Sequence, residues 1–176
     1  MAEITFLSNK TYKESSKYFF VIVFAVITWI LQVSVLNHIQ CFDTACNFML
    51  LGVIYIGLIL GPVYGVLFGI ICSFFSASIL YDHTFYFSYP LVGLFAGLLT
   101  KNLFSDELLF FIVLSFTLTF PYELLNGWQY SIKNPLNIQD RWLMVSLYGA
   151  LINLVIAPFY YLIMNFFTKK SKIRKQ

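Results

Sequence analysis

The side chains best suited to binding a metal lie together between residues 38 and 46. His38, Cys41 and Cys46 supply three of the four ligands that a structural zinc site needs, and His83 or an acidic residue would have to supply the fourth. A disulfide between Cys41 and Cys46 is the other interpretation, and it requires an oxidising side of a membrane. The pattern favours no metal site, so we predict no metal and no cofactor and leave the disulfide open.

Polar residues inside apolar stretches form a second group of candidates, because such groups are costly in lipid and usually serve a function. Asp82 ends one apolar stretch beside His83, where both side chains could simply be hydrated. Glu123 follows Pro121 by two residues; a carboxylate beside a proline kink could bind a partner or substrate, cap a loop or reach the headgroups. Asn153 lies inside the last apolar stretch, where polar side chains usually face other helices. The candidate polar site is therefore Asp82, Glu123 and Asn153.

Spacings typical of catalysis are missing from the sequence. It contains two histidines and no G-x-S-x-G, no H-E-x-x-H and no glycine-rich phosphate loop. The acidic residues of the apolar stretches are not paired within one stretch, whereas general acid–base chemistry needs positioned titratable groups. We therefore predict no catalytic residue and no enzymatic activity.

The composition of the chain predicts that these residues belong to a membrane protein. Of the 176 residues, 60% are hydrophobic and 11% are charged, against about 25% charged residues in soluble domains. A soluble domain this short cannot bury so much apolar surface, so lipid is the expected solvent. No basic run is interleaved with aromatic residues, and we predict no nucleic-acid partner. Residues 1–176 are expected to form a single integral membrane domain.

Six apolar stretches approach the roughly 20 residues that cross a bilayer as a helix. The predicted spans are 18–36, 45–60, 63–81, 85–100, 107–125 and 142–167, of which the second and fourth are short. Gly61-Pro62 predicts a tight hairpin between the second and third spans, because proline cannot continue the helical hydrogen-bond ladder. The predicted fold class is an all-α membrane protein of about six transmembrane helices.

The distribution of Lys and Arg predicts the orientation. Nine of these residues lie in the N-terminal segment 1–17, the loop after the fourth span and the tail 168–176, whereas the other side has only Lys133 and Arg141. Positive charge marks the cytoplasmic side, so both termini are predicted to be cytoplasmic, in agreement with an even number of spans. The longest outer loop is predicted at residues 126–141, with Trp128, Tyr130 and Trp142 in the interfacial belt.

Small residues recur at every fourth position along the third span, and the pattern returns on the fourth. The members of this small-residue stripe are Gly61, Gly65, Gly69, Ser73 and Ala77, followed by Gly93 and Gly97. Such a stripe lets two helix backbones approach closely, and dispersion forces then hold them together. Packing within the protein is the interpretation we favour, and a docking face for a partner's helix is the alternative.

Several of these features occur in an order that is typical of one family. The residues concerned are Leu31, Gln32, Ser34 and Leu36; Gly61, Pro62, Gly65 and Gly69; Asp82; Tyr89, Leu91, Gly93 and Gly97; and Asn153, Pro158 and Tyr161. In these positions the chain resembles the MreD family, the bacterial rod shape-determining membrane proteins. It departs from the family in a short segment between Asp82 and Tyr89 and in the long loop at 126–141.

The resemblance implies a non-enzymatic scaffold of the cell-elongation machinery in the bacterial inner membrane. It also implies a bitopic partner of MreC type, with the cell-wall synthases that build peptidoglycan nearby. The implied fold is similar to the substrate-binding subunits of energy-coupling-factor vitamin transporters, and such a subunit is the alternative function. Those subunits typically carry an A-x-x-x-A-type stripe on the first helix, where this chain has Ala25 followed by Trp29.

Overall fold

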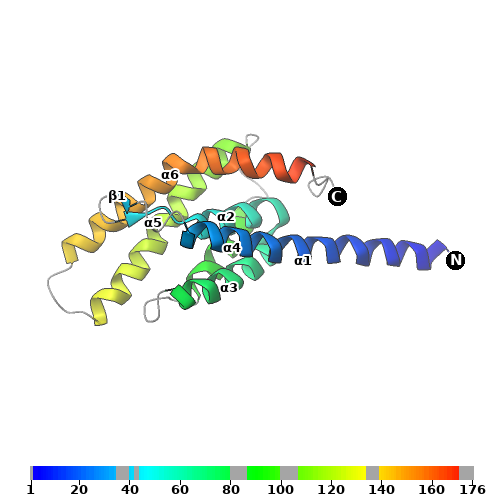
Figure 1. The fold of residues 1–176 in the computed structure, drawn as a ribbon, viewed down its shortest axis with the longest axis horizontal. Helices are drawn as coiled ribbons and strands as arrows, with labels where there is room; N and C mark the ends of the chain where they lie inside the picture. The colour runs from blue at the N-terminus through cyan, green and yellow to red at the C-terminus, as the bar shows by residue number, and fades with distance from the viewer. Residues whose placement is uncertain are drawn as a thin grey trace.

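The computed structural model describes the backbone of residues 2–34, 40–41, 44–79, 87–99, 107–133 and 139–170, and the side chains of 17–34, 44–77, 87–99, 107–128 and 143–166. This part of the chain is almost entirely helical, which confirms the all-α class (Figure 1). The elements are α1 (Ala2–Ser34), β1 (Gln40–Cys41), β2 (Thr44–Ala45), α2 (Phe48–Leu60), α3 (Pro62–Ile79), α4 (Ser88–Leu99), α5 (Glu107–Lys133) and α6 (Gln139–Lys170). The two short strands pair antiparallel.

Three of the helices are long and apolar enough to cross a membrane. The segments concerned are Lys17–Ser34 in α1, Glu107–Trp128 in α5 and Leu143–Phe166 in α6. The N-terminal half of α1 extends beyond the other helices (Figure 1). The N-terminal end of α1 and the C-terminal end of α6 lie at the same end of the molecule.

One of the short apolar helices, α2, is surrounded by the other five. α2 has 13 residues, which corresponds to about 20 Å of helix and falls short of the roughly 30 Å hydrocarbon core. Every residue from Met49 to Leu58 is buried, and α2 contacts each of the other five helices. A helix that is hydrophobic all round is expected to lie in the core, and Figure 1 shows α2 in the middle of the bundle.

The predicted hairpin at Gly61-Pro62 is confirmed. Gly61 has φ +97°, a left-handed conformation that favours glycine, and its N–H donates to the Gly57 carbonyl across 3.0 Å. Pro62 then begins α3, where its missing N–H costs nothing because the first helical N–H groups have no partner within the helix. α2 and α3 therefore run antiparallel with one residue between them.

Four glycines of the small-residue stripe, Gly65, Gly69, Gly93 and Gly97, lie against neighbouring helices of the same chain, whereas Gly61 has open space around it. A Cβ atom added to Gly65 would lie 2.5 Å from the carbonyl oxygen of Gly93, and one added to Gly57 would lie 2.8 Å from that same oxygen. A Cβ atom on Gly69 would lie 2.7 Å from the Cα atom of Pro90. These distances leave no space for a side chain, so α2, α3 and α4 meet backbone to backbone along the glycines.

The prediction of a long loop at residues 126–141 is wrong for most of that range. Residues 126–133 continue α5, and residues 139–141 begin α6. The polar composition of the segment suggested a loop, but its only proline is Pro135. The residue before a proline is disfavoured in the helical conformation, and α5 ends at Lys133, just ahead of it.

Candidate functional site

A cluster of polar side chains lies where four helices converge on the beginning of α2. Its members come from α1, α4, α5 and α6 and from the residue that precedes α2. The members of this polar cluster are Gln32, Asn47, Tyr89, Thr119, Glu123 and Asn153. Buried polar groups are expected to be paired in this way, because leaving them unpaired in an apolar interior is costly.

Asn153 joins α6 to the beginning of α2 and to α5. Its side chain is only 1% exposed. The Oδ1 atom accepts hydrogen bonds from the Asn47 backbone N–H at 2.9 Å and from the Cys46 thiol at 3.1 Å. The Nδ2 group faces Thr119 Oγ1 at 3.4 Å. One carboxamide therefore holds two adjacent residues of the α1–α2 connection.

Asn47 is the centre of the cluster. As the N-cap of α2, its Oδ1 atom accepts from the Leu50 N–H across 3.0 Å, which satisfies one of the N–H groups that the first turn leaves free. Its Nδ2 group lies 3.2 Å from the Tyr89 hydroxyl on α4, and its side chain lies beside the Glu123 carboxylate on α5. Asn47 thus links the beginning of α2 to α4 and α5 through its side chain.

Gln32 binds the same segment from the α1 side. Its Nε2 group donates to the Cys46 carbonyl at 2.9 Å, and its Oε1 atom accepts from the Phe48 N–H at 2.8 Å. A single buried side chain therefore pairs one backbone acceptor and one backbone donor. Residues 46–48 are held by Gln32 on one side and by Asn153 on the other.

The structure brings together two of the three residues of the predicted polar site. Asn153 binds Asn47 and Glu123 lies beside it, while Asp82 lies outside the described residues, as do His83, His38 and the Cys41 side chain. Cys46 is a free, buried thiol, so a disulfide to it is not formed in this structure. Within the described residues, no three His, Cys, Asp or Glu side chains are grouped to hold a metal ion.

Sequence reasoning missed Asn47, Tyr89 and Thr119 as members of the site. Asn47 directly precedes an apolar run, which is the usual signal of an N-cap. Tyr89 entered only through the family resemblance, because an aromatic residue in an apolar stretch carries no separate signal. The Tyr89 ring also packs against Tyr122, with 4.9 Å between the ring centroids.

The chemistry of the polar cluster suits a structural role, the positioning of α2. Its carboxamides and hydroxyls bind one another and the backbone of residues 46–48, and these bonds fix α2 relative to the helices around it. Comparison with protein-family models, with curated proteins and with solved structures gives no match to the chain. Function is therefore argued from the geometry and from the resemblance described above.

Proposed function

We propose that the chain is a non-enzymatic membrane scaffold of the bacterial cell-elongation machinery. It binds a bitopic partner of MreC type through that partner's single transmembrane helix and lies near the synthases that build peptidoglycan. The proposal includes six membrane-crossing helices with both termini in the cytoplasm. It rests on the MreD resemblance together with the way the core is built.

The observation that carries the proposal is the rigid attachment of α2. This helix touches all five other helices, and Gln32, Asn47 and Asn153 fix its first residues through buried and half-buried hydrogen bonds. Buried networks whose members are satisfied rigidify a core. A scaffold needs such a core, because a partner helix must meet the same surface each time.

The outer surface supports the same proposal. Large apolar side chains are exposed along α1, α4 and α6, which suits contact with lipid and with a further helix. In lipid, helices associate through close van der Waals packing and interhelical hydrogen bonds. Gly65, Gly69, Gly93 and Gly97 of the small-residue stripe already face helices of the chain itself, so the partner is expected on another face.

Copurification in a mild detergent tests the proposal. The full-length chain, tagged at its C-terminus, is expected to recover a protein with one transmembrane helix and an extracytoplasmic coiled coil. A matched sample in which the tag is carried by a different polytopic membrane protein of the same cells controls for carry-over. Recovery of ATPase subunits would favour the energy-coupling-factor alternative, and recovery of neither class would contradict the scaffold.

A further inference from the structure

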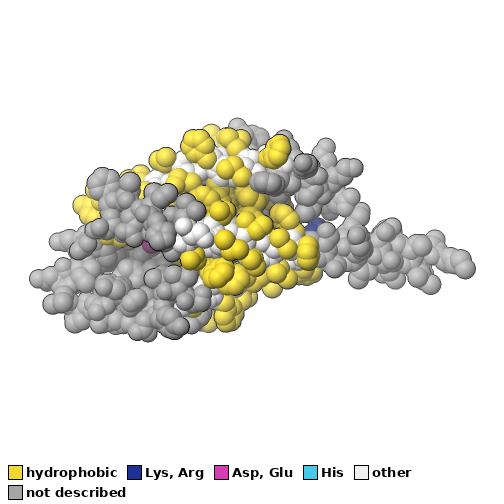
Figure 2. Space-filling view, in the orientation of Figure 1, with side chains coloured by type: hydrophobic (Ala, Val, Ile, Leu, Met, Phe, Trp, Pro, Cys, Tyr) yellow, Lys and Arg dark blue, Asp and Glu magenta, His cyan; other side chains and the backbone are white. Residues whose placement is uncertain are grey.

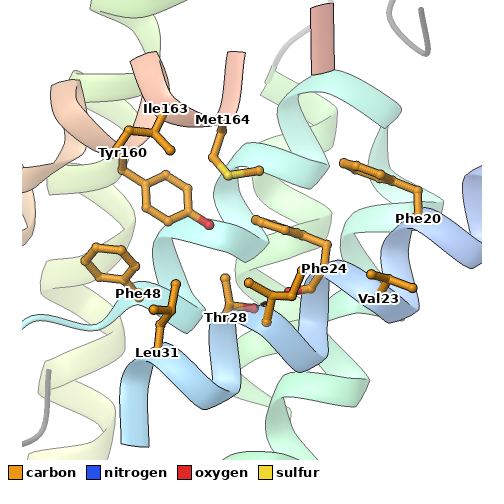
Figure 3. A pocket seen from close by; sticks show the side chains of 10 residues that line it. Phe20, Val23, Phe24, Thr28, Leu31, Phe48, Tyr160, Ile163 and Met164 are labelled. Carbon is orange, nitrogen blue, oxygen red and sulfur yellow. Dashed lines mark hydrogen bonds between the residues drawn. The ribbon is translucent and has the colours of Figure 1, made fainter. Parts of the chain in front are cut away.

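A groove between α1 and α6 offers a ligand nothing but apolar surface. It has a volume of about 290 Å³. Figure 3 shows Phe20 and Leu31 of α1 toward its two ends, with Tyr160 and Ile163 of α6 on the opposite side. Phe48, at the beginning of α2, is also part of the lining.

Neither of the two hydroxyl groups beside the groove is available to a ligand. The Thr28 hydroxyl donates to carbonyl oxygens of its own helix, at 2.7 Å to Phe24 and 3.0 Å to Ala25. The Tyr160 hydroxyl is buried against α2, where a Cβ atom added to Gly52 would lie 3.0 Å from its oxygen. A polar group that entered the groove would lose water and gain no hydrogen bond, which is costly. The part of a molecule that enters is therefore a hydrocarbon.

The groove is long and narrow. Its lining on α1 extends from Phe20 to Leu31, which corresponds to about 16 Å of helix. This length is about half of the roughly 30 Å hydrocarbon core, the depth of one leaflet. A volume of about 290 Å³ drawn out over this length is much thinner than a helix, whose diameter with side chains is about 10–12 Å. A single acyl chain fits these dimensions, whereas a partner's helix could insert only side chains.

The groove opens sideways, between two helices that are long enough to cross a membrane. Val23, Ile27 and Leu31 on α1 and Ile163 on α6 line the groove and are also exposed on the outer surface. Figure 2 shows hydrophobic side chains over the described surface of both helices in this view. A chain that enters here comes from the hydrocarbon of the bilayer.

Basic residues of both helices lie beyond the Phe20 end of the groove. Lys17 precedes Phe20 by three residues, which places it one turn further along the same face of α1. Its Nζ atom lies 5.9 Å from the centroid of the Tyr64 ring. α6 runs in the opposite direction and ends at Lys169 and Lys170, past the same end of the groove (Figure 1). Figure 2 shows dark blue, the colour of Lys and Arg, at this edge of the hydrophobic surface.

No described acidic side chain lines the groove or balances this charge inside it. Glu107 and Glu123 are the acidic residues whose side chains the structure describes. Glu107 accepts a hydrogen bond from Tyr161, which does not line the groove, at 2.9 Å. Glu123 belongs to the polar cluster. Lys17 is therefore the described charge next to the groove, and its ammonium group complements an anion.

We infer that the groove binds one acyl chain of an anionic phospholipid, whose phosphate lies at the Lys17 end. The apolar lining takes the chain, and the basic residues beyond Phe20 attract the headgroup. A zwitterionic lipid brings a positive charge of its own to this end, so an anionic lipid is bound more tightly. The inference rests on the membrane embedding of the proposed function and is independent of the partner.

Photolabelling of the full-length protein in nanodiscs tests the inference. Two probes carry the same diazirine on one acyl chain and differ in the headgroup, which is phosphatidylglycerol in one and phosphatidylcholine in the other. Phe24 and Met164 line the groove but are only 6% and 7% exposed. Labels on these two residues, mapped by mass spectrometry, therefore report a chain inside the groove and not the lipid around the protein. The phosphatidylglycerol probe is expected to label them several-fold more than the phosphatidylcholine probe.

Variants of Lys17 test the contribution of the headgroup. Lys17→Gln should lower the phosphatidylglycerol labelling about fivefold, the effect of one basic side chain near anionic lipid, and leave the phosphatidylcholine labelling unchanged. Lys17→Arg keeps the charge and should retain the wild-type labelling. Lys10→Gln is the matched control, because it removes the same charge about 10 Å further along α1.

A second pair of variants blocks the groove from its rim. Ile27→Trp should reduce labelling by both probes to background, while Ile30→Trp, outside the lining on the same helix, should not. The two side chains are equally exposed, at 49% and 48%, so both variants are expected to fold.

The outcomes distinguish the inference from the proposed function. Equal labelling by the two probes, unchanged in Lys17→Gln, would overturn the inference, because the groove would then take any hydrocarbon chain. Absence of labels on Phe24 and Met164 in wild-type protein would also overturn it, and loss of the copurified partner in Ile27→Trp would then assign the groove to side chains of the partner's helix. The expected labelling together with failed copurification would leave the inference standing and contradict the scaffold alone.

Discussion

Asn47 and Asn153 are separated by 106 positions in the sequence, yet the Asn47 backbone N–H donates to Asn153 Oδ1 across 2.9 Å. The bond ties the beginning of the central helix α2 to the middle of α6. The Cys46 thiol shares the same acceptor at 3.1 Å. A single oxygen atom on α6 therefore accepts from two consecutive residues of the α1–α2 connection.

The first prediction is that Asn153→Ala destabilises the fold. The change leaves the Asn47 N–H and the Cys46 thiol without their acceptor in an apolar interior, at a cost of about 1–3 kcal/mol. Thermal unfolding in one detergent, followed by size-exclusion chromatography, measures it. Thr117→Val is the control, because that exposed hydroxyl binds only the Val113 carbonyl of its own helix. A melting temperature for Asn153→Ala that equals the control would contradict the role given to Asn153.

The second prediction is that Gln32 and Asn153 act on the same segment. Gln32→Leu removes two hydrogen bonds to the backbone of Cys46 and Phe48 and should cost about 1–3 kcal/mol by itself. Once one side chain has released residues 46–48, the other has less left to hold. The double variant Gln32→Leu/Asn153→Ala should therefore lose less stability than the two single variants added together. Additive losses, within about 0.5 kcal/mol, would mean that the two contacts are independent.

The helices themselves could be predicted from the sequence, because an apolar run of this length has few ways to pair its backbone polar groups other than as a helix. Each of the six predicted spans overlaps one observed helix, from 18–36 in α1 to 142–167 in α6. Glycine followed by proline also determines local geometry directly, and the hairpin at Gly61-Pro62 is found where it was expected. The membrane crossing of all six helices stays a prediction.

The partners of these helices could not be predicted in the same way. The spacing of Gly65 and Gly69 indicates close packing, but any helix can fill such a surface, and the structure assigns it to α4. The polar cluster depends on contacts between residues as distant as Asn47 and Asn153, which no local pattern reveals. The prediction of a loop at 126–141 was wrong for the opposite reason. It relied on a local signal, the polar composition of the segment, although no proline interrupts residues 126–133.

The third prediction concerns orientation. Lys17 lies over the ring of Tyr64, 5.9 Å from its centroid, which places the Gly61-Pro62 hairpin at the Lys17 end of the apolar segment Lys17–Ser34 of α1. If the basic N-terminal segment is cytoplasmic, a cysteine at the exposed position Val63 should be cytoplasmic too. In a Cys41→Ser background, a membrane-impermeant maleimide should label Val63→Cys only after the cells are lysed.

Trp128 supplies the opposite reporter for the same experiment. It lies near the far end of the α5 segment that is long enough to cross a membrane, and its side chain is exposed. Trp128→Cys should therefore be labelled in intact cells whose outer surface is accessible to the reagent. Labelling of Val63→Cys in intact cells, with protection of Trp128→Cys, would reverse the proposed topology.

The fourth prediction uses two glycines whose surroundings differ. Gly65→Ala would place a Cβ atom 2.5 Å from the Gly93 carbonyl oxygen, so α3 and α4 must move apart. Overpacking of this kind costs about 1–3 kcal/mol. Gly149→Ala on α6 would meet the Glu123 side chain at 3.4 Å, which is an ordinary contact, and it gains up to about 1 kcal/mol of helix propensity. The two variants should therefore shift the melting temperature in opposite directions.

The last prediction asks what the stripe supports besides stability. A leucine at Gly69 would press on the backbone of Pro90, 2.7 Å from the added Cβ atom. Leu67→Ile is the control, because it lies two residues away, outside the stripe, and changes only the shape of a side chain. We expect Gly69→Leu to accumulate poorly in the membrane and Leu67→Ile to accumulate normally, as immunoblots of membrane fractions would record. Normal accumulation of Gly69→Leu with loss of the partner would mean that the stripe docks the partner's helix. Normal accumulation with normal partner recovery would contradict both interpretations, because α3 would then tolerate a large side chain where the structure leaves no room for one.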